Sequence, residues 1–236
     1  MASISMHAII PAAGTGRRMF TDLPKQYLRF CGRTVLEHSL HPFLTHDTIR
    51  SVTVVLDSED THWPQLRCSR HPKVRTARGG ESRMDSVLSG LESLLSEPGL
   101  AEASDMVLVH DAARPCFTLS DLDELLAHLQ RDPEGGLVAI PATDTVKFAQ
   151  DGHAQQTLNR ETIWLAQTPQ AFPAARLRQA IETAVRAGRT ITDEAGAMEQ
   201  AGHRPRLFPG STHNIKITTQ EDLPLAQFIL QSWEWE

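Results

Sequence analysis

Apolar and polar positions recur along the chain with two different spacings. Short apolar runs rich in β-branched residues are typical of buried strands, and apolar residues spaced three and four apart are typical of amphipathic helices. The pattern predicts strands at residues 8–10, 51–56, 73–77, 105–109, 136–142 and 214–218. It predicts helices at residues 34–44, 82–95, 121–130, 173–187, 193–201 and 220–231, and a weakly helical stretch at 61–68.

Capping residues support two helix starts. Thr34 is followed three residues later by Glu37, which is the spacing of a capping box, and Ser120 is predicted to cap the helix at residues 121–130. Because strands alternate with helices, the pattern predicts βαβ units and a mainly parallel sheet with right-handed crossovers.

Three loops are expected to meet at one edge of this sheet. Ligands on such sheets bind beyond the carboxyl ends of the strands. The loops at residues 11–25, 78–83 and 110–115 all follow predicted strands. They are therefore the candidate ligand-binding loops.

The region after the strand at 136–142 has a different pattern. Residues 144–148 and 156–159, separated by a polar turn, predict a β-hairpin without a crossover helix. Because this hairpin is polar, it has little apolar surface to bury against its own domain. We therefore predict an arm at about residues 142–163 that reaches a neighbouring subunit. The alternative is a solvated hairpin on the protein surface. We expect a single domain over residues 1–236 that carries this arm.

Composition excludes several functional classes. The 236 residues are 40% hydrophobic and 22% charged, as in globular proteins, and the net charge of −6 argues against nucleic-acid binding. Three scattered cysteines predict neither a disulfide framework nor a zinc site, and the eleven histidines lack metal-binding spacings. Because no signal peptide and no apolar run of about 18 residues is evident, we expect a cytoplasmic protein that does not span a membrane.

The first loop has the chemistry of a polyphosphate site. Gly14 and Gly16 let the backbone approach a ligand closely, and Arg17, Arg18 and Lys25 supply positive charge. The spacing does not match a Walker A loop. Nor does it match the dinucleotide fingerprint, which needs a third glycine where Met19 stands and an acid about twenty residues on. A plain glycine turn beside surface basic residues is the remaining alternative.

Five stretches in order carry a resemblance to a known family. They are Pro11-Ala-Ala-Gly-Thr-Gly-Arg-Arg-Met19 with Pro24-Lys25-Gln26, Gly79-Gly-Glu-Ser-Arg83, Val109-His-Asp-Ala-Ala-Arg-Pro115, Thr190-Ile-Thr-Asp-Glu194 and Asn214-Ile-Lys-Ile217. Together they resemble the 2-C-methyl-D-erythritol 4-phosphate cytidylyltransferase (IspD) family over residues 7–230. The resemblance implies an α/β, Rossmann-like fold of nucleotidyltransferase type with a β-hairpin dimerisation arm.

The resemblance also implies a reaction and a set of site residues. The phosphate of methylerythritol phosphate would attack the α-phosphorus of CTP and release pyrophosphate, with Mg²⁺ held mainly by the triphosphate and also by Asp111. Implied catalytic residues are Arg18, Lys25, Arg160 and Lys216. Implied substrate-binding residues are Pro11, Ala12, Ala13, Gly14, Gly16, Gly80, Glu81, Arg83, Ser86, Asp111, Ala112, Arg114, Thr145, Thr168 and Thr192. The family often has Gly-Gly-Asp/Glu-x-Arg at residues 79–83, and Glu81 is the longer of the two acids. Base selection is unaffected if the main chain contacts the cytosine, but it would change if the side chain does.

Alternatives from the residues alone remain open at this point. A cytidylyltransferase for another polyol phosphate, such as ribitol 5-phosphate, would use the same loops. A non-catalytic nucleotide-sensing module would not need Arg18, Lys25 and Lys216 together. Lys216 in a predicted strand and Asp111 at a strand end also have ordinary structural explanations, as a solvated lysine and a helix cap.

Overall fold

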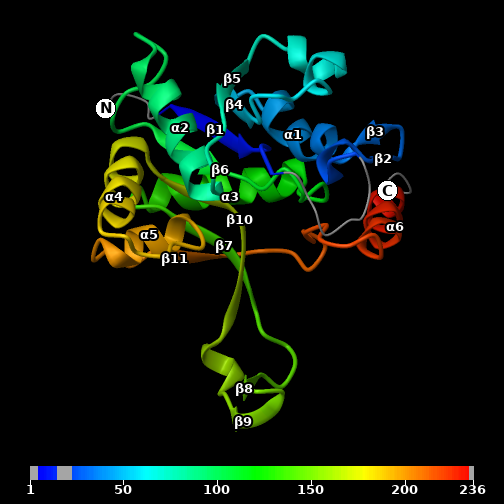
Figure 1. Ribbon diagram of the computed structural model, residues 1–236, viewed down its shortest axis with the longest axis vertical. Coiled ribbons are helices and arrows are strands. Elements are labelled where there is room, and N and C mark those ends of the chain that lie inside the picture. The colour runs from blue at the N-terminus through cyan, green and yellow to red at the C-terminus, as the bar shows by residue number, and fades with distance from the viewer. Residues whose placement is uncertain (1–4, 15–22, 234–236) are drawn as a thin grey trace.

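A seven-stranded sheet with one antiparallel member organises the chain. The computed structural model describes residues 5–14 and 23–233 (Figure 1). The sheet order is β11-β7-β10-β6-β1-β4-β5. Its strands are β1 (Met6–Pro11), β4 (Ile49–Leu56), β5 (Val74–Arg78), β6 (Met106–Val109), β7 (Gly136–Pro141), β10 (Trp164–Pro173) and β11 (Arg206–Pro209). Only β10 pairs antiparallel, with β6 and β7. The predicted mainly parallel sheet is confirmed.

Helices and short elements follow the strands. The helices are α1 (Val35–Thr45), α2 (Arg83–Ser96), α3 (Leu119–Arg131), α4 (Ala174–Arg186), α5 (Glu194–Gln200) and α6 (Asp222–Trp233). The 3₁₀ turns are η2 (Lys25–Tyr27), η3 (Trp63–Gln65), η4 (Arg67–Arg70) and η5 (Arg160–Thr162). The described residues also contain two small hairpins. One pairs β2 (Arg29–Phe30) with β3 (Arg33–Thr34), and the other pairs β8 (Lys147–Gln150) with β9 (His153–Thr157).

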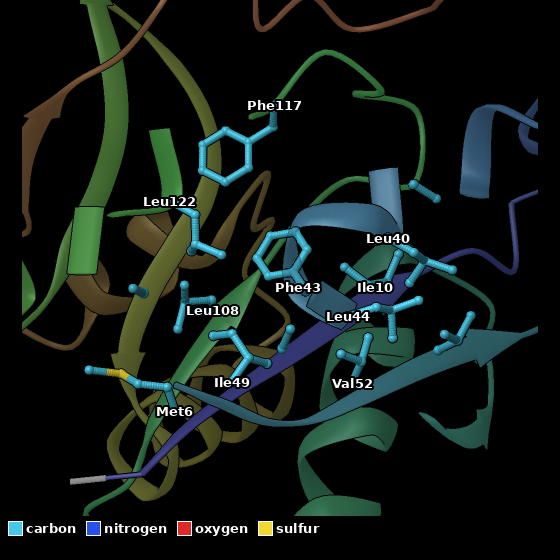
Figure 2. Close-up of a cluster of buried hydrophobic side chains, with 14 of the residues drawn as sticks. Met6, Ile10, Leu40, Phe43, Leu44, Ile49, Val52, Leu108, Phe117 and Leu122 are labelled. Atoms are coloured by element: carbon cyan, nitrogen blue, oxygen red, sulfur yellow. The ribbon is translucent and has the colours of Figure 1, made fainter. Parts of the chain in front are cut away.

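The sheet has an apolar core on each face. Successive side chains of a strand point to opposite faces. Accordingly, Ala8 and Ile10 of β1 pack into a cluster with α1 and α3, whereas Ile9 packs with α2, α4 and α5. Figure 2 shows the first cluster, with Phe43 of α1 among its labelled side chains. Both cores hold the strands in place. The loops at the carboxyl ends of the strands therefore begin at fixed positions.

One predicted helix cap is correct and the other is wrong. Thr34 caps α1 in a capping box with Glu37, as predicted. Ser120 does not cap α3, because that helix already begins at Leu119. Its cap is Thr118, whose hydroxyl accepts a hydrogen bond from Asp121 N at 3.0 Å in a capping box.

The second half of the sheet differs most from the sequence pattern. Residues 214–218 were predicted as a strand but form an irregular segment. The second half of the sheet instead contains β10 and β11, and the sequence pattern predicts neither strand. In β10 the pairing with β7 shifts register between Ala166 and Gln170, around Pro169, which cannot donate a ladder hydrogen bond. The irregular register and the proline explain why the strand pattern is weak.

The predicted hairpin projects away from the sheet. β7 and β10 run together to Trp164 opposite Pro141, and β8 and β9 lie beyond them at the far end (Figure 1). Every residue of β8 and β9 is exposed. We call residues 142–163 the arm.

Among the described residues, no helix is both long enough and apolar enough to cross a bilayer.

Candidate active site

A cavity of about 430 Å³ lies where the three predicted loops meet. It is lined by residues of the loop that follows β1, of the start of α2 and the loop before it, of the loop after β6, and of the irregular 214–218 segment. The lining residues are Pro11, Ala12, Ala13, Gly14, Lys25, Gln26, Gly80, Glu81, Ser82, Arg83, Ser86, Asp111, Ala112, Ala113 and Lys216. A larger cavity of about 610 Å³ lies between the β2–β3 hairpin, α1 and η4. It contains none of the predicted site residues, so the smaller cavity is the candidate active site.

The loop after β1 is fixed by its neighbours as it enters the cavity. Ala12 N donates to Val55 O of β4 at 2.8 Å. The buried Gln26 amide donates to Ala12 O at 2.8 Å and to Gly14 O at 3.0 Å. These bonds turn the main chain of Ala12–Gly14 towards the cavity wall. The predicted Gly16 and Arg18 lie outside the described residues.

The loop before α2 packs tightly against the first loop. A Cβ built on Gly79 would lie 2.3 Å from the Cβ of Ala13, so only glycine permits this approach. Ser86 Oγ accepts a hydrogen bond from Gly80 N at 3.2 Å and donates to Ser82 O at 3.0 Å. The predicted Ser86 therefore holds Gly80 in place, and Glu81 is an exposed wall residue.

Asp111 is the centre of a cluster of opposite charges. Its Oδ2 lies 2.8 Å from Lys216 Nζ and 3.5 Å from Arg114 Nε, and Arg83 Nε donates to Oδ1 at 3.1 Å. Burial alone would raise the pKa of Asp111, but the charges of Arg83 and Lys216 outweigh it and hold the pKa well below its usual range. Asp111 is therefore ionised throughout the physiological range.

Arg83 joins Asp111 to a second, deeper carboxylate. Its Nη1 and Nη2 donate to the two oxygens of Glu194 at 2.6 and 3.2 Å. Burial opposes the charge on Arg83, but Glu194 and Asp111 together raise its pKa. Burial also raises the pKa of Glu194, against the effect of Arg83. The guanidinium thus has carboxylate partners on both sides.

The segment that carries Lys216 is anchored although it is not a strand. Ile217 is fully buried, and its N–H donates to Ala113 O at 2.8 Å. Arg114 Nη1 donates to Asn214 O at 2.6 Å. Lys25 Nζ, from the other end of the chain, donates to Ile217 O at 2.9 Å. These contacts bring two lysines to one wall of the cavity.

Behind Asp111, a neutral histidine completes a chain of hydrogen bonds. Burial lowers the pKa of His110 to about 4, so its ring is neutral at pH 7. Its Nε2 faces Arg114 O at 3.1 Å and must donate, since a carbonyl only accepts. Its Nδ1 then accepts from the Thr168 hydroxyl at 3.1 Å, and that oxygen accepts from Asp111 N at 3.0 Å. The chain fixes the backbone at Asp111.

This buried histidine predicts a loss of stability at mildly acidic pH. Unfolded, His110 would titrate near its ordinary pKa of about 6.5, so between that value and about 4 only the unfolded chain binds the proton. The free energy of unfolding should therefore fall as the pH drops, by up to ~1.4 kcal/mol per pH unit for one proton. Urea titrations at pH 7 and 5 measure the change.

A His153→Gln variant is the control, because His153 is exposed on the arm and should leave the pH slope unchanged. A buried His110→Gln replacement should flatten the slope. An equally steep slope in that variant would assign the proton uptake to another group.

The remaining predicted residues do not line the cavity. Thr145 and Arg160 lie exposed on the arm, where Arg160 Nη1 donates to Thr143 O at 2.6 Å. Thr192 is exposed just before α5. Thr168 and Arg114 are buried behind the wall, with the bonds described above. The structure thus brings together the residues of the main loops and leaves the arm residues apart.

Comparison with known proteins places this arrangement in a family. A sequence profile described as "IspD: 2-C-methyl-D-erythritol 4-phosphate cytidylyltransferase" matches residues 6–232. The chain belongs to the IspD family. It is thereby an enzyme, a cytidylyltransferase of isoprenoid biosynthesis.

Individual IspD proteins resemble the chain along nearly its whole length. A 2-C-methyl-D-erythritol 4-phosphate cytidylyltransferase from Pseudomonas aeruginosa is 53% identical over 216 residues, which cover 91% of this chain and 92% of the relative. A crystal structure of 4-diphosphocytidyl-2C-methyl-D-erythritol synthase has a TM-score of 0.84 at 37% identity and covers 97% and 99% of the two chains. The Francisella tularensis IspD structure has a TM-score of 0.78 at 33% identity, covering 95% and 99%.

Two functional-looking residues were missed from the sequence. Gln26 and Glu194 stand inside motifs that carried the resemblance, yet neither was given a role. Their buried side chains bind the loop after β1 and Arg83, respectively. Each residue directly follows a charged residue, Lys25 or Asp193, so the local sequence does not set it apart, and the groups that it binds come from elsewhere in the chain.

Proposed function

We propose that the described cavity binds CTP and catalyses its reaction with 2-C-methyl-D-erythritol 4-phosphate. The single observation that carries this proposal is the convergence of Lys25 and Lys216 on a cavity walled by the backbone of Ala12–Gly14. Backbone groups suit a flat base and a triphosphate, while the two ammonium groups suit the charge that develops on phosphorus. Arg18, from the same loop, would join Lys25 at the triphosphate.

The chemistry needs positioning more than it needs a base. The attacking group is a phosphate oxygen that is already an anion, so no proton has to be removed. As the new P–O bond forms at the α-phosphorus of CTP, the bond to the pyrophosphate oxygen breaks and pyrophosphate leaves with its electron pair. Preorganised cations lower the barrier by stabilising the charge of this transition state. Lys25 and Lys216 are the described cations on the cavity wall that fit the task; the third, Arg83, is held by two carboxylates.

Magnesium fits the cavity through one carboxylate and the triphosphate. The described residues contain no group of three or more His, Cys, Asp or Glu side chains that could cage a metal. Mg²⁺ accepts such sites, because it binds through one or two carboxylates together with phosphates and water. Asp111 would hold the ion through an oxygen lone pair not engaged by its cationic neighbours. When bound, the ion neutralises charge on the triphosphate.

The second substrate and the dimer are proposed together. Arg160 and Thr145 lie on the projecting arm, so they would complete the cavity of a partner subunit, as would be expected of a two-fold dimer. Phe148, Trp164 and Leu165, on or beside the arm, are between 39% and 54% exposed, which supports an interface there. Thr192 would contact the acceptor from the same subunit, and Thr168 would act through its bond to Asp111. The cysteines Cys31, Cys68 and Cys116 form no disulfide among the described residues, which supports a cytoplasmic location.

Pyrophosphate release tests the proposed reaction. With CTP, Mg²⁺ and 2-C-methyl-D-erythritol 4-phosphate the protein should release pyrophosphate and form the cytidylyl product, measured by a coupled phosphate assay and mass spectrometry. ATP and GTP should react far more slowly if, as proposed, the loop backbone binds the cytosine base.

A parallel assay with ribitol 5-phosphate tests the alternative acceptor. A strong preference for ribitol 5-phosphate, or for a purine nucleotide, would contradict the assignment. CTP binding without any turnover would favour the nucleotide-sensing alternative.

A further inference from the structure

Glu194 is a fully buried carboxylate behind the candidate active site. Its side chain has no solvent exposure, and its two oxygens lie 2.6 and 3.2 Å from Arg83 Nη1 and Nη2. Because Glu194 is the first residue of α5, its place is set by the Asp193 cap, whose Oδ1 accepts from Gly196 N at 2.9 Å. The helix also fixes the adjacent Ala195 N–H, which donates to Gln170 at 2.7 Å. The carboxylate is thus held rigidly from its own side.

Burying an ionised carboxylate destabilises the folded protein unless the carboxylate is paired with a positive charge. Bidentate guanidinium–carboxylate pairing is the strongest form of such a pair and fixes the plane of both groups. It engages the two outer nitrogens of Arg83 and leaves Nε to donate to Asp111 at 3.1 Å. Glu194 therefore determines the orientation of the Arg83 guanidinium. It thereby also determines the side from which Arg83 donates to Asp111.

We propose that Glu194 is a positioning residue, which orients Arg83 and through it the Asp111–Lys216 pair for cytidylyl transfer. Glu194 does not line the cavity. Its effect passes from Glu194 to Arg83, from Arg83 to Asp111, and from Asp111 to Lys216 Nζ at 2.8 Å. The inference rests on the reaction proposed above.

The sign of the expected effect separates positioning from simple electrostatics. The cluster contains two carboxylates, Asp111 and Glu194, and three cations, Arg83, Arg114 and Lys216. Removing one negative charge makes the cavity more attractive to polyanionic substrates, so electrostatics alone predicts equal or better activity. Positioning predicts the opposite for kcat, because an amide presents a donor to the guanidinium. Arg83 would then turn towards Asp111 and compete with Lys216.

The test is Glu194→Gln, assayed with CTP and 2-C-methyl-D-erythritol 4-phosphate. We expect kcat to fall by on the order of 10²-fold, as for a displacement of about 1 Å at a reacting centre. KM for CTP should stay the same or fall. Asp105→Asn is the matched control, since Asp105 is 4% exposed at the opposite end of the sheet and accepts from Ser5 N and Glu102 N. It should lower Tm with kcat unchanged.

A double variant separates the loss of stability from the loss of the charged network. Arg83→Met with Glu194→Leu removes both buried charges, which should recover most of the Tm lost by Glu194→Leu alone. The positioning role predicts that kcat stays low in this stable double variant. Recovery of kcat together with Tm, or a Glu194→Gln enzyme within about twofold of wild type, would overturn the proposal. Failure of the wild-type enzyme itself would instead refute the proposed reaction.

Discussion

Replacing Lys25 with alanine should lower kcat by ~10²–10³, the usual loss for one preorganised group that acts on a transition state. Lys25 Nζ is held at the cavity wall by Ile217 O at 2.9 Å, beside the segment that carries Lys216. Because its position is already fixed, no reorganisation is needed when charge develops on the α-phosphorus. Steady-state rates of pyrophosphate release measure kcat, and KM for CTP should rise far less than kcat falls.

Lys73→Ala is the control for this variant. Lys73 also donates from Nζ to a main-chain carbonyl, His46 O at 2.7 Å, but it does not line the cavity. Its loss should leave kcat unchanged and remove only a comparable contact. If Lys25→Ala instead keeps a near-normal kcat with a raised KM, Lys25 serves ground-state binding of CTP and not catalysis.

Local sequence patterns predicted the part of the fold that local forces determine. The βαβ units, the Thr34 capping box and the three loops at the carboxyl ends of strands each depend on residues within a short window. Parallel strands place their carboxyl ends at one edge, so the meeting of the loops followed from fold class alone. The cavity walls were therefore predictable without any knowledge of side-chain contacts.

The remaining features depend on partners that are distant in sequence. β10 contains Pro169 and a register shift, so its antiparallel place in the sheet is decided by β6 and β7 and not by its own pattern. The prediction of a strand at residues 214–218 is wrong for the opposite reason, because the pattern of this segment is that of a strand but its surroundings are not. Its apolar side chains Ile215 and Ile217 pack with α6 and α1, and its backbone bonds to loop residues instead of a strand.

The role of Glu194 was hidden in the same way. A glutamate at the start of a helix is ordinarily explained by the helix dipole. Only the fold brings it to Arg83, 111 positions away, and buries the pair. The sequence motif that contains Glu194 contributes to the family resemblance, but it does not show which atoms the Glu194 carboxylate binds.

The arm leads to the prediction that most directly tests the assembly. Arg160 lies at the end of the arm in η5, and the described cavity contains no arm residue. Figure 1 shows the arm pointing away from the body of its own subunit. If each active site takes Lys25 from one subunit and Arg160 from the other, then Lys25→Ala and Arg160→Ala homodimers should both be nearly inactive.

Refolding these two inactive variants together should restore activity. Random pairing makes about half the dimers mixed, and each mixed dimer has one site with both lesions and one site with neither, so activity should recover to roughly a quarter of wild type. A double Lys25→Ala/Arg160→Ala variant refolded with wild type supplies the reciprocal control. Its mixed dimers carry one lesion in each shared site, so only the wild-type homodimers, roughly a quarter of the total, remain active. If Arg160 serves its own subunit, the first mixture stays inactive and the second retains about half. That pattern, with mixed dimers verified by native mass spectrometry, would reject the shared site and leave the family assignment unchanged.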